Sequence, residues 1–124
     1  MISMRFGRGV VLALASAGVL ASTHEVRPGA TPVARGAAVF SKYCALCHGS
    51  SGAGDGRAAS VQKVAPADLT VSTRSPGYKL QIVRDGGAEL GRSSSMPAWG
   101  DVLSDAEIAD VVDYIETLKP ARSK

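Results

Sequence analysis

Hydrophobic residues recur every third or fourth position in three stretches of this chain. The stretches cover residues 32–44, 78–85 and 105–118. This period places apolar side chains on one face of an α-helix, whereas a half-buried strand would alternate apolar and polar residues. No segment alternates convincingly, and no internal repeat is present. The pattern therefore predicts an all-α protein.

The first helix has a defined start and one continuous face. Thr31 is a suitable N-cap, and Pro32 fits the first helical position because that position needs no backbone donor. Gly36, Phe40 and Cys44 follow at intervals of four residues. They should therefore lie on one side of the helix.

The other two helices are bounded by recognisable end signals. Tyr78 begins a short amphipathic helix that we expect to end at Asp85, because a glycine pair follows at 86–87. Residues 104–107 (SDAE) match the capping box, in which a serine and a glutamate satisfy free backbone N–H groups reciprocally. Pro120 ends the last helix.

The N-terminal segment is expected to be removed. Two arginines precede an uncharged, mostly apolar run from Val10 to Leu20, and small residues around Ala21 suit cleavage. A membrane span needs about 20 residues, and this run is shorter. A cleaved leader is therefore favoured, and an uncleaved anchor is the alternative. Residues 1–21 thus predict a signal peptide and a periplasmic location. Residues 22–31 should form a flexible tail, 32–120 one domain, and 121–124 a C-terminal tail.

The charge balance argues against nucleic-acid binding. The whole chain has 14 Lys and Arg against 11 Asp and Glu, but two of the arginines lie in the expected leader. The mature chain would be nearly neutral, at +1, and it has no basic stripe with interleaved aromatic residues. We expect no nucleic-acid partner, and membrane contact only through partner complexes or an uncleaved leader.

Residues 44–48 (CALCH) carry the candidate chemistry. The pattern CxxCH is the attachment site of a c-type haem. Each thiol can form a thioether with a vinyl group of the porphyrin, and the adjacent imidazole can then reach the iron. The sequence therefore predicts one covalently attached haem c, bound by Cys44, Cys47 and His48.

Two cysteines can also form a disulfide, a thiol redox pair or half of a zinc site. Zinc needs four ligands, and the other histidine, His24, lies in the N-terminal tail. A thioredoxin-like pair is expected after a strand and at the start of a helix, whereas these cysteines close a helical stretch. Zinc binding and thiol exchange are the alternatives to haem. The GSSGAGDG loop that follows is not a dinucleotide fingerprint, because Arg57 occupies the third glycine position.

Met96 is the candidate for the second axial ligand. It is the only methionine outside the expected leader, and no histidine follows His48. A lone methionine is more often core filler, but Met96 lies in a polar loop, and Pro97 favours an extended backbone there. Pairing of His with Met raises the reduction potential relative to His/His. We therefore expect His48 and Met96 to be the metal ligands.

The imidazole of His48 also needs an acceptor for its second nitrogen, which fixes the orientation of the ring. A backbone carbonyl in the Ala65–Pro66 turn is a suitable acceptor, and we choose Pro66. Four further side chains are candidates to contact haem propionates or shield the haem edge, although ordinary core or surface roles are as well supported. They are Tyr78, Lys79, Arg92 and Trp99.

Together these elements resemble the class I cytochromes c, especially the short bacterial monohaem type. The resemblance spans residues 33–118 and includes Gly36, Phe40, the CxxCH segment, the GDG of 54–56, the PADL of 66–69, the glycine pair 86–87 and the MPAW of 96–99. It implies a compact fold of three to five helices wrapped around one covalent haem. It also implies His48 and Met96 as axial ligands, with the Pro66 carbonyl on the histidine side.

The same resemblance implies a contact between the first and last helices. In that family these helices cross where small residues meet. Here Gly36 and Phe40 would then contact Val111 and Tyr114.

The functional interpretation is electron transfer without catalysis. We expect a periplasmic carrier, monomeric or in transient complexes, that docks on donor and acceptor proteins; no catalytic residue is assigned. One alternative is a cytochrome c subunit of a periplasmic oxidoreductase complex, of the dehydrogenase or sulfur-oxidising type. Another is a haem sensor or peroxidase-like enzyme in which Met96 dissociates.

The distribution of charge adds one detail about partners. Residues 22–100 carry nine basic and five acidic groups, whereas residues 101–116 carry six acids and no base. A solvated helix face accounts for most of these acids. The asymmetry nevertheless makes the haem-bearing segment the positive end of a dipole, which favours partners with acidic docking patches.

Overall fold

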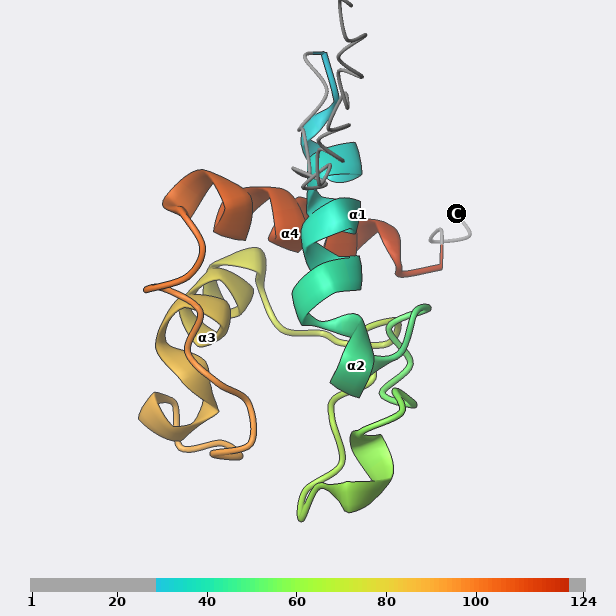
Figure 1. Ribbon diagram of the computed structural model, residues 1–124, viewed down its shortest axis with the longest axis vertical. Coiled ribbons are helices and arrows are strands. Elements are labelled where there is room, and N and C mark those ends of the chain that lie inside the picture. Colours follow the sequence, from blue (N-terminus) through green and yellow to red (C-terminus); the bar gives the residue numbers. More distant parts are fainter. Residues whose placement is uncertain (1–28, 121–124) are drawn as a thin grey trace, which may run out of the picture.

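A computed structural model describes residues 29–120 of the chain. This range contains four α-helices and no strand. The elements are α1 (Pro32–Tyr43), α2 (Ala45–His48), the 3₁₀ turn η1 (Ala59–Val61), α3 (Pro76–Glu89) and α4 (Asp105–Thr117). Long loops connect α2, α3 and α4 (Figure 1). The expected all-α class is confirmed. The expected signal peptide at 1–21, most of the tail at 22–31 and the tail at 121–124 lie outside the described residues.

The starts of α1 and α4 follow the sequence signals. The Thr31 hydroxyl accepts a hydrogen bond from the Ala34 N–H at 3.2 Å. At α4, the Ser104 hydroxyl accepts from the Glu107 N–H at 3.3 Å, while the Ser104 N–H donates to Glu107 Oε2 at 2.9 Å. Both N-caps are therefore confirmed, and α4 begins with a complete capping box.

Helices α1 and α4 cross in direct contact (Figure 1). A Cβ atom on Gly36 would lie 1.9 Å from the Asp110 carbonyl oxygen and 2.9 Å from Tyr114 Cβ, so only glycine allows this approach. The rings of Phe40 and Tyr114 meet at a centroid distance of 5.3 Å. The expected contact is confirmed, since Val111 also lies in the buried cluster with Phe40.

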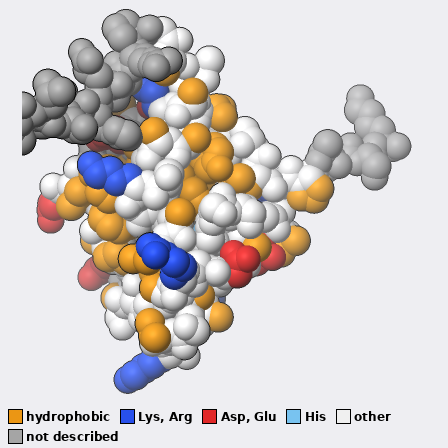
Figure 2. Space-filling model, turned by 45° about the vertical axis from the view of Figure 1, so that its right-hand side comes forward, with side chains coloured by type: hydrophobic (Ala, Val, Ile, Leu, Met, Phe, Trp, Pro, Cys, Tyr) orange, Lys and Arg blue, Asp and Glu red, His pale blue; other side chains and the backbone are white. Residues whose placement is uncertain are grey.

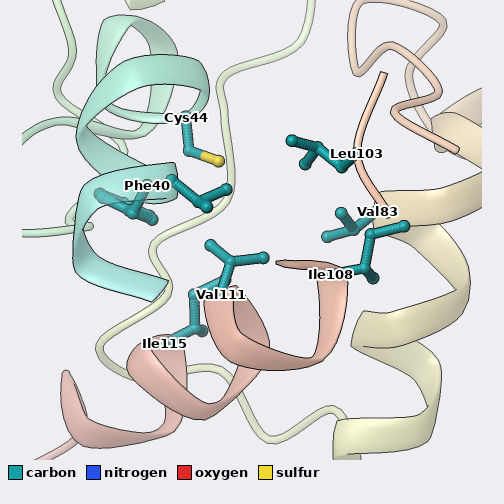
Figure 3. Close-up of a cluster of buried hydrophobic side chains, with 8 residues drawn as sticks. Phe40, Cys44, Val83, Leu103, Ile108, Val111 and Ile115 are labelled. Atoms are coloured by element: carbon teal, nitrogen blue, oxygen red, sulfur yellow. The ribbon is translucent and has the colours of Figure 1, made fainter. Parts of the chain in front are cut away.

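The hydrophobic core lies between this crossing and α3. Figure 3 shows side chains from α1, α3 and α4 converging, with the sulfur of Cys44 directed into the cluster. The buried members are Val39, Phe40, Cys44, Val83, Leu103, Ile108, Val111 and Ile115. Cys44 is thus placed at the junction of the first helix and the core.

Helix α3 is longer than the expected helix over 78–85. It begins at Pro76, where the Ser75 hydroxyl accepts from the Tyr78 N–H at 3.2 Å. At the other end, Gly86 adopts φ +83° and kinks the helix, which then continues to Glu89. The predicted start was therefore two residues late, whereas the break at the glycine pair was predicted correctly. The start at Ser75 and Pro76 was overlooked, and the non-helical Gly86 interrupts the helix at the expected place before a kinked continuation to Glu89.

Polar side chains also join the helices. Arg35 of α1 pairs with Asp110 of α4, through Nε–Oδ2 at 2.6 Å and Nη2–Oδ1 at 2.9 Å. Lys79 of α3 is 4% exposed and pairs with Glu116, which Lys119 also contacts at 2.6 Å. Within residues 29–120, no helix is both long and apolar enough to cross a membrane.

Candidate functional site

The CxxCH segment folds as one compact turn at the end of α1. The Cys44 carbonyl accepts hydrogen bonds from the N–H groups of Cys47, at 3.2 Å, and His48, at 2.9 Å. Cys44 is buried, Cys47 is half-buried, and the two thiols are not joined in a disulfide. The turn therefore holds two free thiols and an imidazole within five consecutive residues.

The glycine-rich loop after His48 folds back onto this turn. The Gly54 N–H donates to the His48 carbonyl at 2.8 Å, and the Gly56 N–H donates to the Cys47 carbonyl at 3.0 Å. A Cβ on Gly56 would lie 2.3 Å from the Leu46 carbonyl oxygen. Glycine is thus required because the loop backbone lies directly against α2, and the contact fixes the turn from outside.

The ring of His48 is held through one nitrogen. Its Nδ1 lies 3.0 Å from the Ala67 carbonyl oxygen. A carbonyl can only accept, so Nδ1 carries the proton, and Nε2 keeps the lone pair that binds a metal. The expected Pro66 acceptor was wrong by one residue. The Pro66 carbonyl instead faces Gly54, where an added Cβ would lie 2.6 Å from its oxygen.

Met96 approaches the same core from the loop between α3 and α4. It is half-buried and packs against the hydrophobic cluster that contains Cys44. Its backbone is fixed at both ends, since the Met96 N–H donates to the Ser93 carbonyl at 3.2 Å and the Met96 carbonyl accepts from Gly87 at 2.9 Å. The structure therefore brings Met96, from a loop, and Cys44, from the end of α1, to one hydrophobic cluster.

The chemistry of the cysteines fits haem attachment better than the alternatives. Burial, and then the neighbouring Cys47, raise the pKa of the Cys44 thiol to about 12. A thiol with so high a pKa is a poor nucleophile in exchange and a poor source of metal-binding thiolate at neutral pH. Among residues 29–120, no group of three or more His, Cys, Asp or Glu side chains could hold a metal ion. Zinc and thiol exchange thus lose support, whereas the apolar surroundings of Cys44 suit a thioether.

The four additional candidates have separate surroundings. Lys79 is buried against Glu116, and Trp99 packs edge-on against Tyr43 with ring centroids 5.2 Å apart. Arg92 Nε donates to the Tyr78 hydroxyl at 3.2 Å. The structure therefore brings Tyr78 and Arg92 together, and it gives Lys79 and Trp99 structural contacts within the protein.

Comparison with known proteins gives the family. The family described as cytochrome c oxidase, cbb3-type, subunit III matches residues 31–115. This chain belongs to that cytochrome c family.

Two relatives are subunits of larger enzymes. The chain is 36% identical over 99 residues to the cbb3-type cytochrome c oxidase subunit FixP of Azorhizobium caulinodans, covering 78% of this chain and 31% of that protein. It is 30% identical over 117 residues to the subunit CcoP of Azospirillum brasilense, covering 91% of this chain and 39% of that protein. The chain thus spans about a third of the length of these cbb3-type relatives.

A smaller relative and a solved structure extend the comparison. Cytochrome c6 of Picosynechococcus is 38% identical over 95 residues, covering 69% of this chain and 73% of that protein. A chain of the reducing HAO-like protein complex of Kuenenia stuttgartiensis has a TM-score of 0.65 and 27% identity. That match covers 77% of this chain and 47% of the other.

The family membership confirms the predicted fold and cofactor. The protein is an all-α, monohaem c-type cytochrome of electron transport, and it carries covalently attached haem c. Haem c, rather than zinc, is therefore the cofactor of the CxxCH segment.

Proposed function

We propose that this protein is an exported electron carrier whose haem iron is ligated by His48 and Met96. The observation that carries the proposal is the CxxCH turn with the His48 ring fixed on the Ala67 carbonyl at 3.0 Å. Cys44 and Cys47 would supply the two thioether sulfurs from that turn. The ring is oriented through Nδ1, so that Nε2 is available to the iron.

Each part of the site has a distinct task. When bound, haem c supplies a one-electron Fe(III)/Fe(II) couple. His48 and Met96 would hold the iron, and the soft Met96 sulfur would favour the reduced state and so raise the reduction potential. The apolar cluster around Cys44 excludes water from this region. With both ligands supplied by its own side chains, the chain would act as a carrier, and no catalytic residue is proposed.

The proposal includes export and a single functional domain. Residues 1–21 would direct the chain to the periplasm, where bacterial c-type haem is attached, and residues 32–120 would form the cytochrome domain. The family match over residues 31–115 supports the bounds of the cytochrome domain.

A surface beside the CxxCH turn is suited to transient docking. Leu46, Val61 and Val64 are exposed, Val61 at 79%, and Arg57 and Lys63 lie in the same segment. The Ala58 N–H donates to the Leu46 carbonyl at 2.9 Å, which brings the 57–64 segment next to α2. Figure 2 shows basic side chains lying among hydrophobic ones on one face of the molecule. We name residues 46, 57, 61, 63 and 64 the basic–apolar surface, and its partner would present an acidic rim.

A second candidate function is a permanent subunit of an oxidoreductase complex. The relevant observation is that the chain matches only 31% of FixP and 47% of the chain from the HAO-like complex. Its fold therefore also occurs as part of larger proteins. Copurification of a second chain from the native host at stoichiometric yield would favour this function over a free carrier.

The ligand assignment is tested by spectroscopy of the protein matured with haem-attachment machinery. The full chain should retain its haem on a denaturing gel and show a low-spin spectrum with the weak long-wavelength methionine–iron band. Met96→Ala should keep the covalent haem, lose the band and lower the reduction potential. Val102→Ala is the matched control, because it truncates an exposed apolar residue near the same loop. Persistence of the band in Met96→Ala would overturn the assignment.

Carbon monoxide separates the carrier from a sensor or peroxidase-like enzyme. The untreated ferrous protein should bind carbon monoxide poorly, because Met96 occupies the position that the gas requires. Ready binding to the unmodified protein would support a dissociating ligand and contradict the carrier proposal.

A further inference from the structure

The loop that carries Met96 is attached to α3 on both sides of the methionine. The Arg92 N–H donates to the Gly87 carbonyl at 2.7 Å, and the Gly87 N–H donates to the Met96 carbonyl at 2.9 Å. Beyond Met96, the Trp99 N–H donates to the Val83 carbonyl at 2.9 Å, and the chain continues along α3. Gly87 therefore uses both of its backbone groups to hold the loop.

The loop lies against α3 at a distance that only glycine permits. A Cβ on Gly87 would lie 2.1 Å from the Ser93 carbonyl oxygen and 3.1 Å from Met96 Cβ. A Cβ on Gly86, whose φ is +83°, would lie 2.9 Å from the Ala98 N and 3.2 Å from the Met96 carbonyl oxygen. Most of these atoms are backbone, so a side-chain rotation cannot relieve the conflict. Any residue larger than glycine must push the loop away from the helix.

We propose that Gly86 and Gly87 are positioning residues for the Met96 ligand. The kink at Gly86 turns the Gly87 amide toward the loop, and the bare face of both glycines lets the Met96 backbone lie against α3. This contact sets how far the Met96 sulfur extends toward the core that contains Cys44. The inference rests on the His48/Met96 ligation proposed above. It states that the contact between α3 and the loop determines how strongly the Met96 sulfur binds the iron.

Two other glycines of this region, Gly77 and Gly91, lack such contacts. Gly77 lies in the same helix, and an added Cβ would meet only the Ser75 hydroxyl at 4.0 Å. Gly91 has φ +63°, but nothing lies within 4 Å of an added Cβ. A general need for flexible residues would not explain why the close contacts occur at Gly86 and Gly87. The difference supports a specific role in placing Met96.

The test compares Gly87→Ala with Gly77→Ala in the holoprotein. We expect Gly87→Ala to retain covalent haem and helical circular dichroism. It should also lose or weaken the methionine–iron band, lower the reduction potential and bind carbon monoxide more readily. Gly77→Ala should match the wild type in all of these. A purely structural role for Gly87 would change the thermal midpoint and leave the band and the potential unchanged, which would overturn the inference.

A milder variant keeps the test decisive if Gly87→Ala yields no haem protein. A Cβ on Gly100 would lie 3.0 Å from both Arg84 Cγ and the Arg84 carbonyl oxygen, at the far anchor of the same loop. Gly100→Ala should weaken the band and lower the potential to a smaller extent, and an unchanged band would count against positioning by α3. A wild-type protein without the band would instead show that the proposed Met96 ligation itself is wrong.

Discussion

Arg35 of α1 and Asp110 of α4 form a bidentate ion pair at the crossing of the two helices. Nε and Nη2 of the guanidinium donate to the two carboxylate oxygens at 2.6 and 2.9 Å, and Nη1 donates to the Ala30 carbonyl at 2.8 Å. The Asp110 side chain is 10% exposed. The ion pair connects α1 with α4, and the hydrogen bond to Ala30 connects the residues before α1 with the same arginine. It therefore stabilises the scaffold that holds the CxxCH turn.

Removal of the guanidinium should destabilise the protein more than removal of the carboxylate. Arg35→Ala leaves a buried carboxylate without its partner, whereas Asp110→Ala leaves an arginine that water can reach. We expect Asp110→Ala to lower the free energy of unfolding by about 1–2 kcal/mol, and Arg35→Ala to lower it by more. Equilibrium denaturation of the two variants measures the difference. The exposed pair Arg84–Asp105 is the control, and Asp105→Ala should change stability little. Equal effects of Arg35→Ala and Asp105→Ala would contradict this assignment.

Gly36 sets the distance between the same two helices. Gly36→Ala would place a methyl group 1.9 Å from the Asp110 carbonyl oxygen, and overpacking of this kind costs about 1–3 kcal/mol. Gly77→Ala is the control, because it adds the same methyl group in open space and should stabilise α3 by about 0.5–1 kcal/mol. Opposite signs of the two changes in unfolding free energy are the expected result. If both variants lost stability, the cause would be the backbone conformation of the helices and not the distance between α1 and α4.

The sequence located the helices well where a local signal exists. Thr31 and Ser104 cap their helices as expected because N-capping depends on residues three positions apart. The start of α3 was placed two residues late, and the kinked continuation beyond Gly86 was not predicted, since it depends on the loop that packs against the glycine pair. Helix α2 and η1 are too short to show a period. Local chemistry could therefore be read from the sequence, but kinks and short turns set by tertiary contacts could not.

For the candidate site as well, local features could be predicted from the sequence and features set by tertiary contacts could not. The residue types of the CxxCH segment are visible in the sequence, and the turn that unites them is local. The acceptor of His48 was misplaced by one residue. Gly54 packs against the Pro66 carbonyl, so the Ala67 carbonyl is the one that faces His48, and this contact cannot be read from the sequence. The attachment of the Met96 loop to Gly87 was also missed. The only signal for it was the glycine pair itself, whose meaning depends on a contact nine residues away.

Acid should weaken α4 through its capping box. Hydrogen bonds from the Ser104 N–H and hydroxyl hold the pKa of Glu107 below its ordinary value. A lowered pKa contributes stability that is present above the unfolded-state pKa, about 4.3, and is lost as the pH falls through the folded-state pKa. The stability advantage of the wild type over Glu107→Gln should therefore shrink below about pH 4. Because Glu107 is largely exposed, we expect the whole effect to stay below about 1 kcal/mol.

Chemical denaturation across this pH range measures the effect of the capping box. Asp113→Asn, on the exposed face of the same helix, is the control for general loss of negative charge from α4. Its stability difference from the wild type should change less with pH. A Glu107→Gln variant whose disadvantage grows in acid would reverse the expected sign and contradict the capping interpretation.

The basic–apolar surface should control the rate of electron transfer to anionic partners. Arg57 and Lys63 lie in the segment that folds back beside Leu46, so reversing both charges should repel an anion approaching the CxxCH turn. We expect Arg57→Glu/Lys63→Glu to slow reduction of an anionic oxidant such as ferricyanide several-fold at low salt. The deficit should disappear near 1 M salt, where the Debye length is about 3 Å. Arg74→Glu/Arg84→Glu changes the net charge equally but at other sites, so it should slow the reaction less. Equal slowing by the two double variants would show that net charge alone acts, and that the surface beside the CxxCH turn has no special role in docking.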